Sequence, residues 1–519
     1  MAPPPEGLRP SRTLPLVFAV GVLLYLPTIR FGYVQDDRAI IVANPAAHSI
    51  GAAVRAFGEP YWPRPSEAGL YRPIAILSFA ADWSISGGRA GWLHLVNALW
   101  HGLACVLLVV VLRRWLPPLP AIAAGLVFAV HPVHVEGVAN IVSRNELLAV
   151  VAMLAAVLGA RRRWWLAAVV CACLAMLSKE NAIVAGVVIL LDHWLRPEGE
   201  ESYPRWFFGA LATVTIAFLA LWMRVGRPHI ADVAAPFLGA SAGERLAMAL
   251  PALARAARLL FLPVSLSADY SPQVIPYRTT ISLPAILGAV IGLGVVVGGV
   301  TLRRRAPAVC FAAIAAGLAY LPVSNFFFPV GIVLAERNLY LAVLLPAILV
   351  GAAVMWALGR WERPRVLVPL MVMLGVLAYG TLNRLPAWRD NRAFLLTLLI
   401  DHPESYRAQQ SAAAVQAGLG QTAAALTAFA RADSLFGGDP HLKADYAFYL
   451  ITHGDTAAAV TLAREARRRL PRERVALRVD YLMALVRGER DRAVAIADTA
   501  RGWFPSERDW YAAPVRVDR

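Results

Sequence analysis

Long blocks of apolar residues, separated by short polar hinges, place the strongest limit on the fold of this chain. Each block holds roughly 15–22 residues, which suits a hydrocarbon layer about 30 Å thick at about 1.5 Å per helical residue. At that length only helices satisfy their own backbone hydrogen bonds in lipid. The sequence therefore predicts an all-α fold whose first part, residues 1–387, is a polytopic bundle of membrane helices.

The blocks predict about eleven membrane spans. They are the segments 13–29, 91–112, 119–137, 141–160, 164–177, 181–195, 206–223, 281–302, 307–323, 338–358 and 365–382. Residues 244–263 are also helical in pattern but carry four charged side chains. We expect that segment to lie along the outer interface as an amphipathic helix, because a span there would reverse the side of the next basic hinge.

Arginine clusters in the short hinges predict the orientation of the bundle. They are Arg113–Arg114, Arg161–Arg163, Arg196 with Arg205, Arg303–Arg305, and Arg360, Arg363 and Arg365. These clusters fall on alternate hinges, and cytoplasmic loops are the ones enriched in Lys and Arg. We therefore expect a cytoplasmic N-terminus and a C-terminal region on the outer side. The same arginines account for much of the formal net charge of +16, and no nucleic-acid partner is expected.

Polar groups gather at the ends of the predicted helices opposite to the basic hinges. They are Asp36 and Asp37, the hinge from His131 to Arg144, Lys179 with Glu180, Arg224, and Glu336 with Arg337. A charge within a membrane helix costs about 2.5–3.5 kcal/mol on insertion scales and is a functional hypothesis by default. One such hinge is equally well explained by solvation, but several on one face predict a polar pocket there.

Residues 30–90 form a predicted outer loop with two acids near its start. A loop of that length in a compact domain is usually functional. Asp36 and Asp37 are adjacent, so their side chains point in different directions and are expected to have different roles. One could be a general base and the other a hydrogen-bond or metal partner. A solvated turn is the more frequent explanation of an isolated Asp-Asp pair.

The cations of the predicted pocket are candidates for a phosphate site. Arg144, Lys179 and Arg337 are the candidates, and arginine offers a planar fork to phosphate oxygens. Glu180 and Glu336 are expected to hold the neighbouring cations in place, with a purely structural ion pair as the equal alternative. The predicted substrate-binding set is completed by Arg72, His94, His131, His134 and Glu136.

Histidines recur in two patterns. His94, Asn97 and His101 are spaced by three and four, which places them on one helical face that is expected to look into the bundle. His131, His134 and Glu136 are a plausible ligand set for a divalent metal. Because Pro132 disrupts the helical facing of that set, no cofactor is assigned, and a divalent metal stays the alternative.

The region from residue 388 to 519 repeats with a period of 34. Glycines recur at Gly420, Gly454 and Gly488, and alanines recur at the same spacing. A 34-residue helix-turn-helix period is typical of tetratricopeptide repeats, which stack into an α-solenoid with a concave surface. We expect this second domain to hold an acceptor protein; a short helical stalk is the alternative.

Six motifs occur in an order that resembles one family. They are "DDRAIIVANP", "YRPIAILSF", "LHLVNALWH", "FAVHPVHVEGVANIVSRNELLA", "LSKENAIV" and "PVSNFFFPVGIVLAERNLYLAVL". In this order they resemble the transmembrane and tetratricopeptide-repeat O-mannosyltransferases of the glycosyltransferase C superfamily, as a bacterial-type member. Two positions depart from the family pattern: Gln35 stands where the family commonly has Tyr, and Asn145 where it often has Asp.

The resemblance implies a membrane enzyme that uses a polyprenyl-phosphate-linked sugar, typically mannose, and acts on a protein hydroxyl on the non-cytoplasmic side. It maps Asp36 to the catalytic base, with Asp37 as its partner, and it implies a bacterial inner membrane. One displacement at the anomeric carbon would invert that centre, with the departing phosphate stabilised by the cations. The same chemistry on a glycolipid or cell-envelope polymer is the first alternative. A transporter is less favoured, because its charges would lie near the bilayer midplane.

Overall fold

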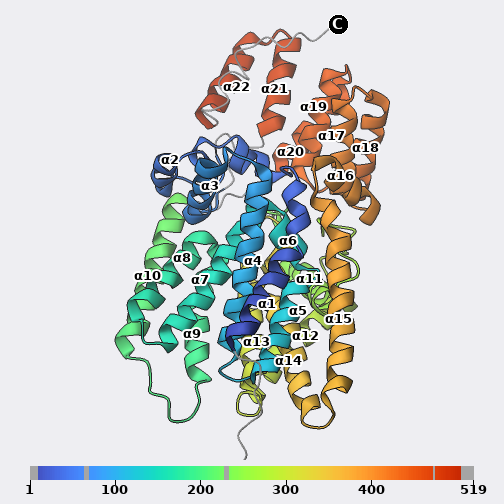
Figure 1. Ribbon diagram of the computed structural model, residues 1–519. Helices are drawn as coiled ribbons and strands as arrows, with labels where there is room; N and C mark the ends of the chain where they lie inside the picture. The colour runs from blue at the N-terminus through green and yellow to red at the C-terminus, as the bar shows by residue number, and fades with distance from the viewer. Residues whose placement is uncertain (1–9, 64–68, 227–232, 277, 472–473, 504–519) are drawn as a thin grey trace, which may run out of the picture.

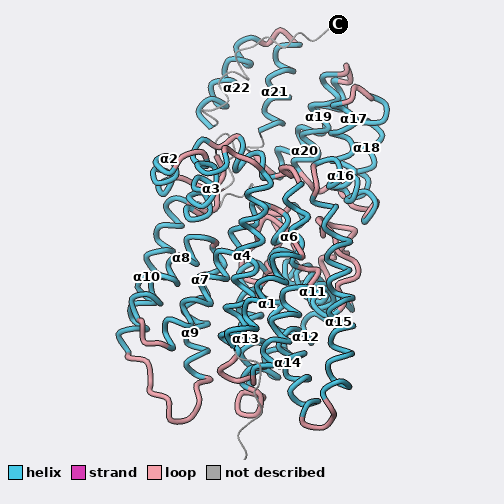
Figure 2. Tube along the Cα trace, viewed as in Figure 1, coloured by secondary structure: helices cyan, strands magenta, loops and turns pink. Residues whose placement is uncertain are grey.

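Helices form nearly all of the ordered structure of this chain. The computed structural model describes residues 10–63, 69–226, 233–276, 278–471 and 474–503. Within these ranges there is no strand, and the only bridge is an isolated one between Pro272 and Ile275. The tube in Figure 2 shows the same all-helical path, and the predicted all-α class is confirmed.

Seven helical segments among the described residues are long and apolar enough to cross a membrane. They contain α1 (Pro10–Leu23) with the short η1 (Leu26–Arg30), α4 (Ala90–Leu112), α7 (Arg144–Arg161), α10 (Arg205–Val225), α12 (Leu283–Thr301), α14 (Leu344–Leu358) and α15 (Arg363–Arg384). Each corresponds to one of the predicted spans. The polytopic bundle predicted from the apolar blocks is therefore present.

The four remaining predicted spans are shorter helices. They are α5 (Pro118–Val130), α8 (Trp165–Ser178), α9 (Ala185–Trp194) and α13 (Pro307–Tyr320). The predicted span 119–137 stops early at Val130, because the residue before Pro132 is held out of the helical conformation. After α8, Lys179 is fully extended at φ −156° and ψ 137°. Of the four, only the span 119–137 was predicted too long. The span 164–177 agrees with α8 to within one residue, and the short helices η6 (Glu180–Val184) and η9 (Leu321–Val323) account for the rest of 181–195 and 307–323.

The two ends of the bundle differ in composition. In Figure 1 the long helices run roughly parallel, and the hinges α9–α10 and α14–α15 lie at the end away from the C-terminal helices. The opposite end carries α2 (Ile50–Arg55), α3 (Pro73–Ser86) and the C-terminal helices. A small apolar core, which includes Ile40, Phe79 and Val142, joins the loop 30–90 to the start of α7.

Helix α11 (Ala242–Phe261) packs closely along α12. A Cβ atom on Gly288 would lie 2.0 Å from the carbonyl oxygen of Leu250, so only glycine allows this approach. A capping box between Ser241 and Glu244 starts α11. Its predicted position along the membrane interface stays a prediction.

The C-terminal region consists of successive helices. They are α16 (Asn391–Asp401), α17 (Tyr406–Gly418), α18 (Thr422–Leu435), α19 (Pro440–Thr452), α20 (Thr456–Arg469), α21 (Arg474–Val486) and α22 (Arg490–Trp503). From α17 onward they pack as three pairs. Gly420, Gly454 and Gly488 stand in the turn of each pair with φ of 71°, 94° and 72°, a conformation that favours glycine. The assignment of these pairs to the tetratricopeptide class stays an interpretation of the period.

The C-terminal helices are attached to the loop that carries the acids. The backbone N–H of Gly32 donates to the carbonyl of Arg389 at 2.9 Å, and that of Gln35 donates to Asn391 Oδ1 at 2.7 Å. Farther along, Ser405 Oγ donates to Asp269 Oδ2 at 2.5 Å. The apolar core of the bundle continues to Ala408. The predicted domain boundary at residue 388 stays a prediction.

Candidate active site

Asp37 is a buried anchor of the outer loop. Its two carboxylate oxygens accept the backbone N–H groups of Val34 and Val142, each at 2.9 Å, and its side chain is fully enclosed. Burial raises the pKa of Asp37 to about 7, opposed by these two hydrogen bonds. Asp37 therefore fixes the loop to the segment that precedes α7, rather than facing a substrate.

Asp36 points elsewhere and is half-buried. Burial raises the pKa of Asp36, and the guanidinium of Arg337 is the largest opposing influence. Glu136, Arg407 and Arg72 also act on its charge. The two adjacent acids thus differ in surroundings, as their adjacency predicts, and Asp36 is the one that lies among cations.

Three ion pairs around Asp36 link distant parts of the chain. We call the group Asp36, Arg72, Glu136, Glu146, Lys179, Glu180 and Arg337 the polar cluster. Arg72 Nε lies 2.9 Å from Glu180 Oε2, Lys179 pairs with Glu146, and Arg337 pairs with Glu136. The cluster joins the outer loop to α6 (His134–Ala139), the start of α7, the residues just after α8, and η10 (Glu336–Leu339). The predicted gathering of polar groups at one end of the bundle is therefore present.

The partners within the cluster differ from those expected from sequence neighbours. Glu180 holds Arg72 and also accepts the backbone N–H of Tyr71 at 2.7 Å, so it does not hold Lys179. Lys179 instead donates to Asn338 Oδ1 at 3.0 Å besides its pair with Glu146, and burial lowers its pKa. The ammonium group of Lys179 is thus buried and bound to two side chains of the protein.

Glu336 faces away from Arg337. It accepts the N–H of Ser267 at 2.6 Å and the hydroxyl of Tyr270 at 2.5 Å. Burial raises the pKa of Glu336 to about 8. Arg337 is held by Glu136 through both its guanidinium and its backbone N–H, while about 29% of its side chain stays exposed. Arg337 is therefore the cation best placed to meet a ligand.

Arg144 is enclosed by protein partners. It has no exposed surface, pairs with Asp82, and donates to Asn97 Oδ1 at 2.7 Å and to the carbonyl of Leu93 at 2.8 Å. Its guanidinium also lies over the ring of Phe79. The expectation that Arg144 binds a phosphate is not supported by this arrangement, because its hydrogen-bonding capacity is directed at side chains and backbone of the protein.

The four predicted histidines are buried and lie against backbone carbonyls. Each Nε2 is within 3.2 Å of one: His94 with Gly32, His101 with Ala129, His131 with Leu260 and His134 with Tyr340. His101 Nδ1 also lies 2.6 Å from the hydroxyl of Tyr340. His94, Asn97 and His101 therefore share the inward face of α4, as their spacing predicts. The histidines connect helices rather than face Asp36.

A divalent metal does not fit the histidine motif in this conformation. The side chains of His131 and His134 are directed at two different carbonyls, and Glu136 is paired with Arg337. Within the described ranges no three His, Cys, Asp or Glu side chains are grouped as a ligand set. We derive no catalytic step through a metal.

Two residues of this region were missed by the sequence analysis. Asp82 lies in the apolar helix α3, and its role as the partner of Arg144 emerges only from the fold. Arg407 belongs to α17, yet its guanidinium lies near enough to Asp36 to lower the pKa of that acid. Ser405 is buried, and its hydroxyl donates a hydrogen bond to Asp269. This contact holds the start of α17 against the bundle, and Arg407 follows two residues later.

Glu136 and Glu336 have different partners, and a pair of matched substitutions would compare their contributions to stability. Glu136→Gln removes the countercharge of Arg337 and should lower the free energy of unfolding by about 1–3 kcal/mol, discounted for the partial exposure of Arg337. Glu336→Gln should cost little at pH 7, because a carboxyl with a pKa of about 8 is already protonated. Thermal unfolding of both purified variants at pH 7 measures the difference. Equal losses would contradict the assignment.

Comparison with known proteins identifies a related group. Residues 79–223 match the family model described as dolichyl-phosphate-mannose-protein mannosyltransferase. Protein O-mannosyl-transferase Tmtc2 of Drosophila melanogaster is 32% identical over 325 residues, which are 58% of this chain and 33% of the relative. Protein O-mannosyl-transferase TMTC3 of Homo sapiens is 27% identical over 380 residues, or 63% of this chain and 41% of the relative.

The chain spans between a third and a half of the length of these two relatives. Among solved structures, ArnT from Cupriavidus metallidurans bound to undecaprenyl phosphate overlaps 88% of this chain and 74% of its own, at 16% identity and a TM-score of 0.36. That structural likeness is too loose to support conclusions. The sequence relationship agrees with the resemblance found in the motifs: the chain is similar to the transmembrane protein O-mannosyl-transferases over part of their length.

Proposed function

We propose that this protein is a membrane glycosyltransferase that transfers a sugar from a polyprenyl-phosphate donor to a Ser or Thr hydroxyl of a protein. The observation that carries the proposal is the placement of half-buried Asp36 beside Arg337 and Arg72 at one end of a helical bundle. An acid that can accept a proton and cations that can stabilise a phosphate are the two groups that this reaction needs.

In the proposed step, Asp36 accepts the proton of the acceptor hydroxyl as the oxygen attacks the anomeric carbon of the sugar. A new C–O bond forms, the bond between the anomeric carbon and the phosphate oxygen breaks, and the polyprenyl phosphate leaves with that electron pair. Displacement from the opposite side inverts the anomeric centre. The burial that raises the pKa of Asp36 strengthens it as a base, because the carboxylate is less stabilised by water.

We assign the phosphate to the two cations of the polar cluster whose side chains remain partly exposed. Arg337 is partly exposed, and Arg72 retains about 14% of its side-chain surface. Glu180 and Glu136 fix these two guanidinium groups, so they meet the departing phosphate already oriented. Lys179 and Arg144 are already paired with Glu146 and Asp82, so the proposal does not assign them to the phosphate.

The donor and the membrane side are part of the same proposal. The isoprenoid chain of the donor stays in the bilayer while its phosphate lies at the interface, which suits a site at helix ends. The arginine-rich hinges at the opposite end support a cytoplasmic location for that end and an outer location for the site. We place the protein in a bacterial inner membrane. Mannose and a protein acceptor are supported by the names of the relatives.

A transfer assay tests this function. The full chain, reconstituted in lipid nanodiscs, would be given radiolabelled polyprenyl-phosphate mannose and a peptide rich in Ser and Thr. We expect label on the peptide, and none on the same peptide with Ala in place of every Ser and Thr. Label that enters only a lipid fraction would favour a glycolipid acceptor. Donor movement across the membrane without bond cleavage would identify a transporter instead.

A further inference from the structure

A groove between the last helices of the chain is lined by arginine. Its walls come from α20, α21 and the start of α22, and it encloses about 370 Å³. That volume is in the range of sites that bind small molecules or a few side chains. The lining contains five arginines, Arg464, Arg467, Arg468, Arg487 and Arg492, against the two acids Asp480 and Glu489. The groove therefore has a formal excess of three positive charges.

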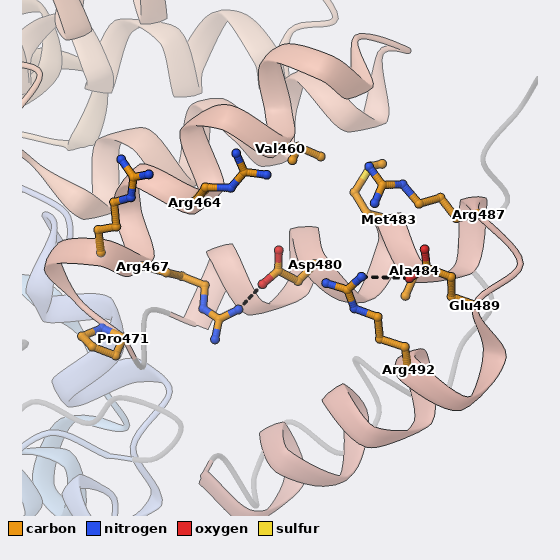
Figure 3. A pocket seen from close by; sticks show the side chains of 11 residues that line it. Val460, Arg464, Arg467, Pro471, Asp480, Met483, Ala484, Arg487, Glu489 and Arg492 are labelled. Atoms are coloured by element: carbon orange, nitrogen blue, oxygen red, sulfur yellow. Dashed lines mark hydrogen bonds and ion pairs between the residues drawn. The ribbon is translucent and has the colours of Figure 1, made fainter.

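The acids neutralise two of these arginines and leave the others without partners. Arg467 pairs with Asp480, and Arg492 Nη1 lies 3.0 Å from Glu489 Oε2. Within the described part of the chain, Arg464, Arg468 and Arg487 form no ion pair. Figure 3 shows the guanidinium groups of Arg464 and Arg487 pointing toward one another across the groove. Like charges that converge in this way repel, and an anion between them would remove that repulsion.

The position of these arginines on their helices gives the groove its shape. Val460, Arg464, Arg467 and Arg468 recur at helical spacing and so share one face of α20. Asp480, Met483, Ala484 and Arg487 share the facing side of α21 and its end. The lining also contains the apolar side chains of Val460, Met483 and Ala484, which can contact the methylene groups of a bound side chain. This combination suits a carboxylate on a short carbon chain.

We propose that this groove binds an acidic segment of a polypeptide, with neighbouring Asp or Glu side chains, and that it thereby holds the acceptor protein. The identity of the partner as acceptor rests on the proposed function, whereas the binding of an acidic segment does not. Arginine forms paired hydrogen bonds with carboxylates, which gives the groove both affinity and orientation. Figure 1 shows α21 and α22 at the end of the molecule beyond the membrane-length helices, farther out than α2 and α3, which favours a polypeptide over a lipid surface.

A binding assay without donor tests the proposal. The probe is a fluorescent peptide Gly-Asp-Glu-Glu-Asp-Gly, compared with its amide counterpart Gly-Asn-Gln-Gln-Asn-Gly, and the protein is the full chain in nanodiscs of uncharged lipid. We expect binding of the acidic peptide alone, weakened by salt. The double variant Arg464→Gln with Arg487→Gln should weaken it by about tenfold or more. Both arginines are exposed, so the variant should stay folded.

The control is Arg431→Gln, which changes an exposed arginine of α18 outside the groove and should leave the affinity unchanged. Equal affinity of the double variant and the wild type would overturn the proposal. So would binding to anionic-lipid vesicles that the double variant loses, without any binding of the peptide. Because no sugar is transferred in this assay, its failure is separate from failure of the transfer assay.

Discussion

Asp36→Asn should reduce sugar transfer to a small residual rate while leaving the protein folded. The amide cannot take the proton of the acceptor hydroxyl, and loss of a general base lowers the rate by about 10²–10⁴-fold. The side chain keeps its size, and its neighbours Arg337 and Arg72 keep their own partners Glu136 and Glu180. The transfer assay under single-turnover conditions measures the rate, and thermal unfolding checks the fold.

The pH profile of the wild type provides a second readout for the same assignment. Asp36 acts as a base only when ionised, so transfer should fall as the pH drops through the raised pKa of Asp36, above its ordinary value of 3.8. The residual activity of Asp36→Asn should lack this inflection. Wild-type turnover in the variant would refute the role of Asp36.

Asp37→Asn is the matched control, because it changes the adjacent acid in the same way. An amide can accept from Val34 or Val142 through its oxygen, but its nitrogen cannot accept from the other. We expect a loss of about 1–3 kcal/mol of stability for the unpaired buried N–H. Activity of Asp37→Asn should therefore fall only as far as the fraction of folded protein falls, and the rate of transfer per folded molecule should stay unchanged.

Arg144→Ala should cause the largest loss of stability among single changes near the site. Breaking a buried ion pair by removing one partner costs about 3–5 kcal/mol, because the remaining charge stays buried. Asp82 would be left without its cation, and Asn97 and the carbonyl of Leu93 would lose donors. Chemical or thermal unfolding in detergent measures this, and Arg144→Lys should restore little since it lacks the planar fork.

The control is Arg163→Ala, which removes an arginine from an ion pair with Glu201 whose side chains are 55% and 73% exposed. Its stability should be unchanged within error. If Arg144→Ala instead left the fold intact and selectively weakened donor binding, Arg144 would be a ligand residue after all. That result would restore the role first expected from its place in the polar hinge.

The apolar blocks were sufficient to predict helices, but not where each one ends. Membrane length follows from composition, so the long segments such as α4 and α12 were found with nearly correct bounds. The end of α8 at Ser178 was also predicted to within one residue, but α5 ends at Val130 because of the backbone conformation before Pro132, which hydropathy does not report. Such breaks place polar side chains at the ends of short helices, where they can meet.

The candidate site was predictable by residue type but not by pairing. The charged motifs Lys179-Glu180 and Glu336-Arg337 indicated a region in which the structure does form several ion pairs. The true partner of Glu180 is Arg72, which lies 108 positions away in sequence, so that no local pattern reveals it. Glu336 is directed to Ser267 and Tyr270 by the packing of a separate loop. Only tertiary structure decides which neighbours in sequence are neighbours in space.

The attachment of the C-terminal helices to the acid-bearing loop has a consequence for protein engineering. Gly32 and Gln35, just before Asp36, are hydrogen-bonded to Arg389 and Asn391 at the start of α16. A chimaera that exchanges the repeat region at residue 388 would replace those hydrogen-bonding partners along with it. A chimaera should therefore join the two parents beyond Ala408, so that the native Arg389 and Asn391 stay with the bundle and keep their hydrogen bonds to the loop before Asp36.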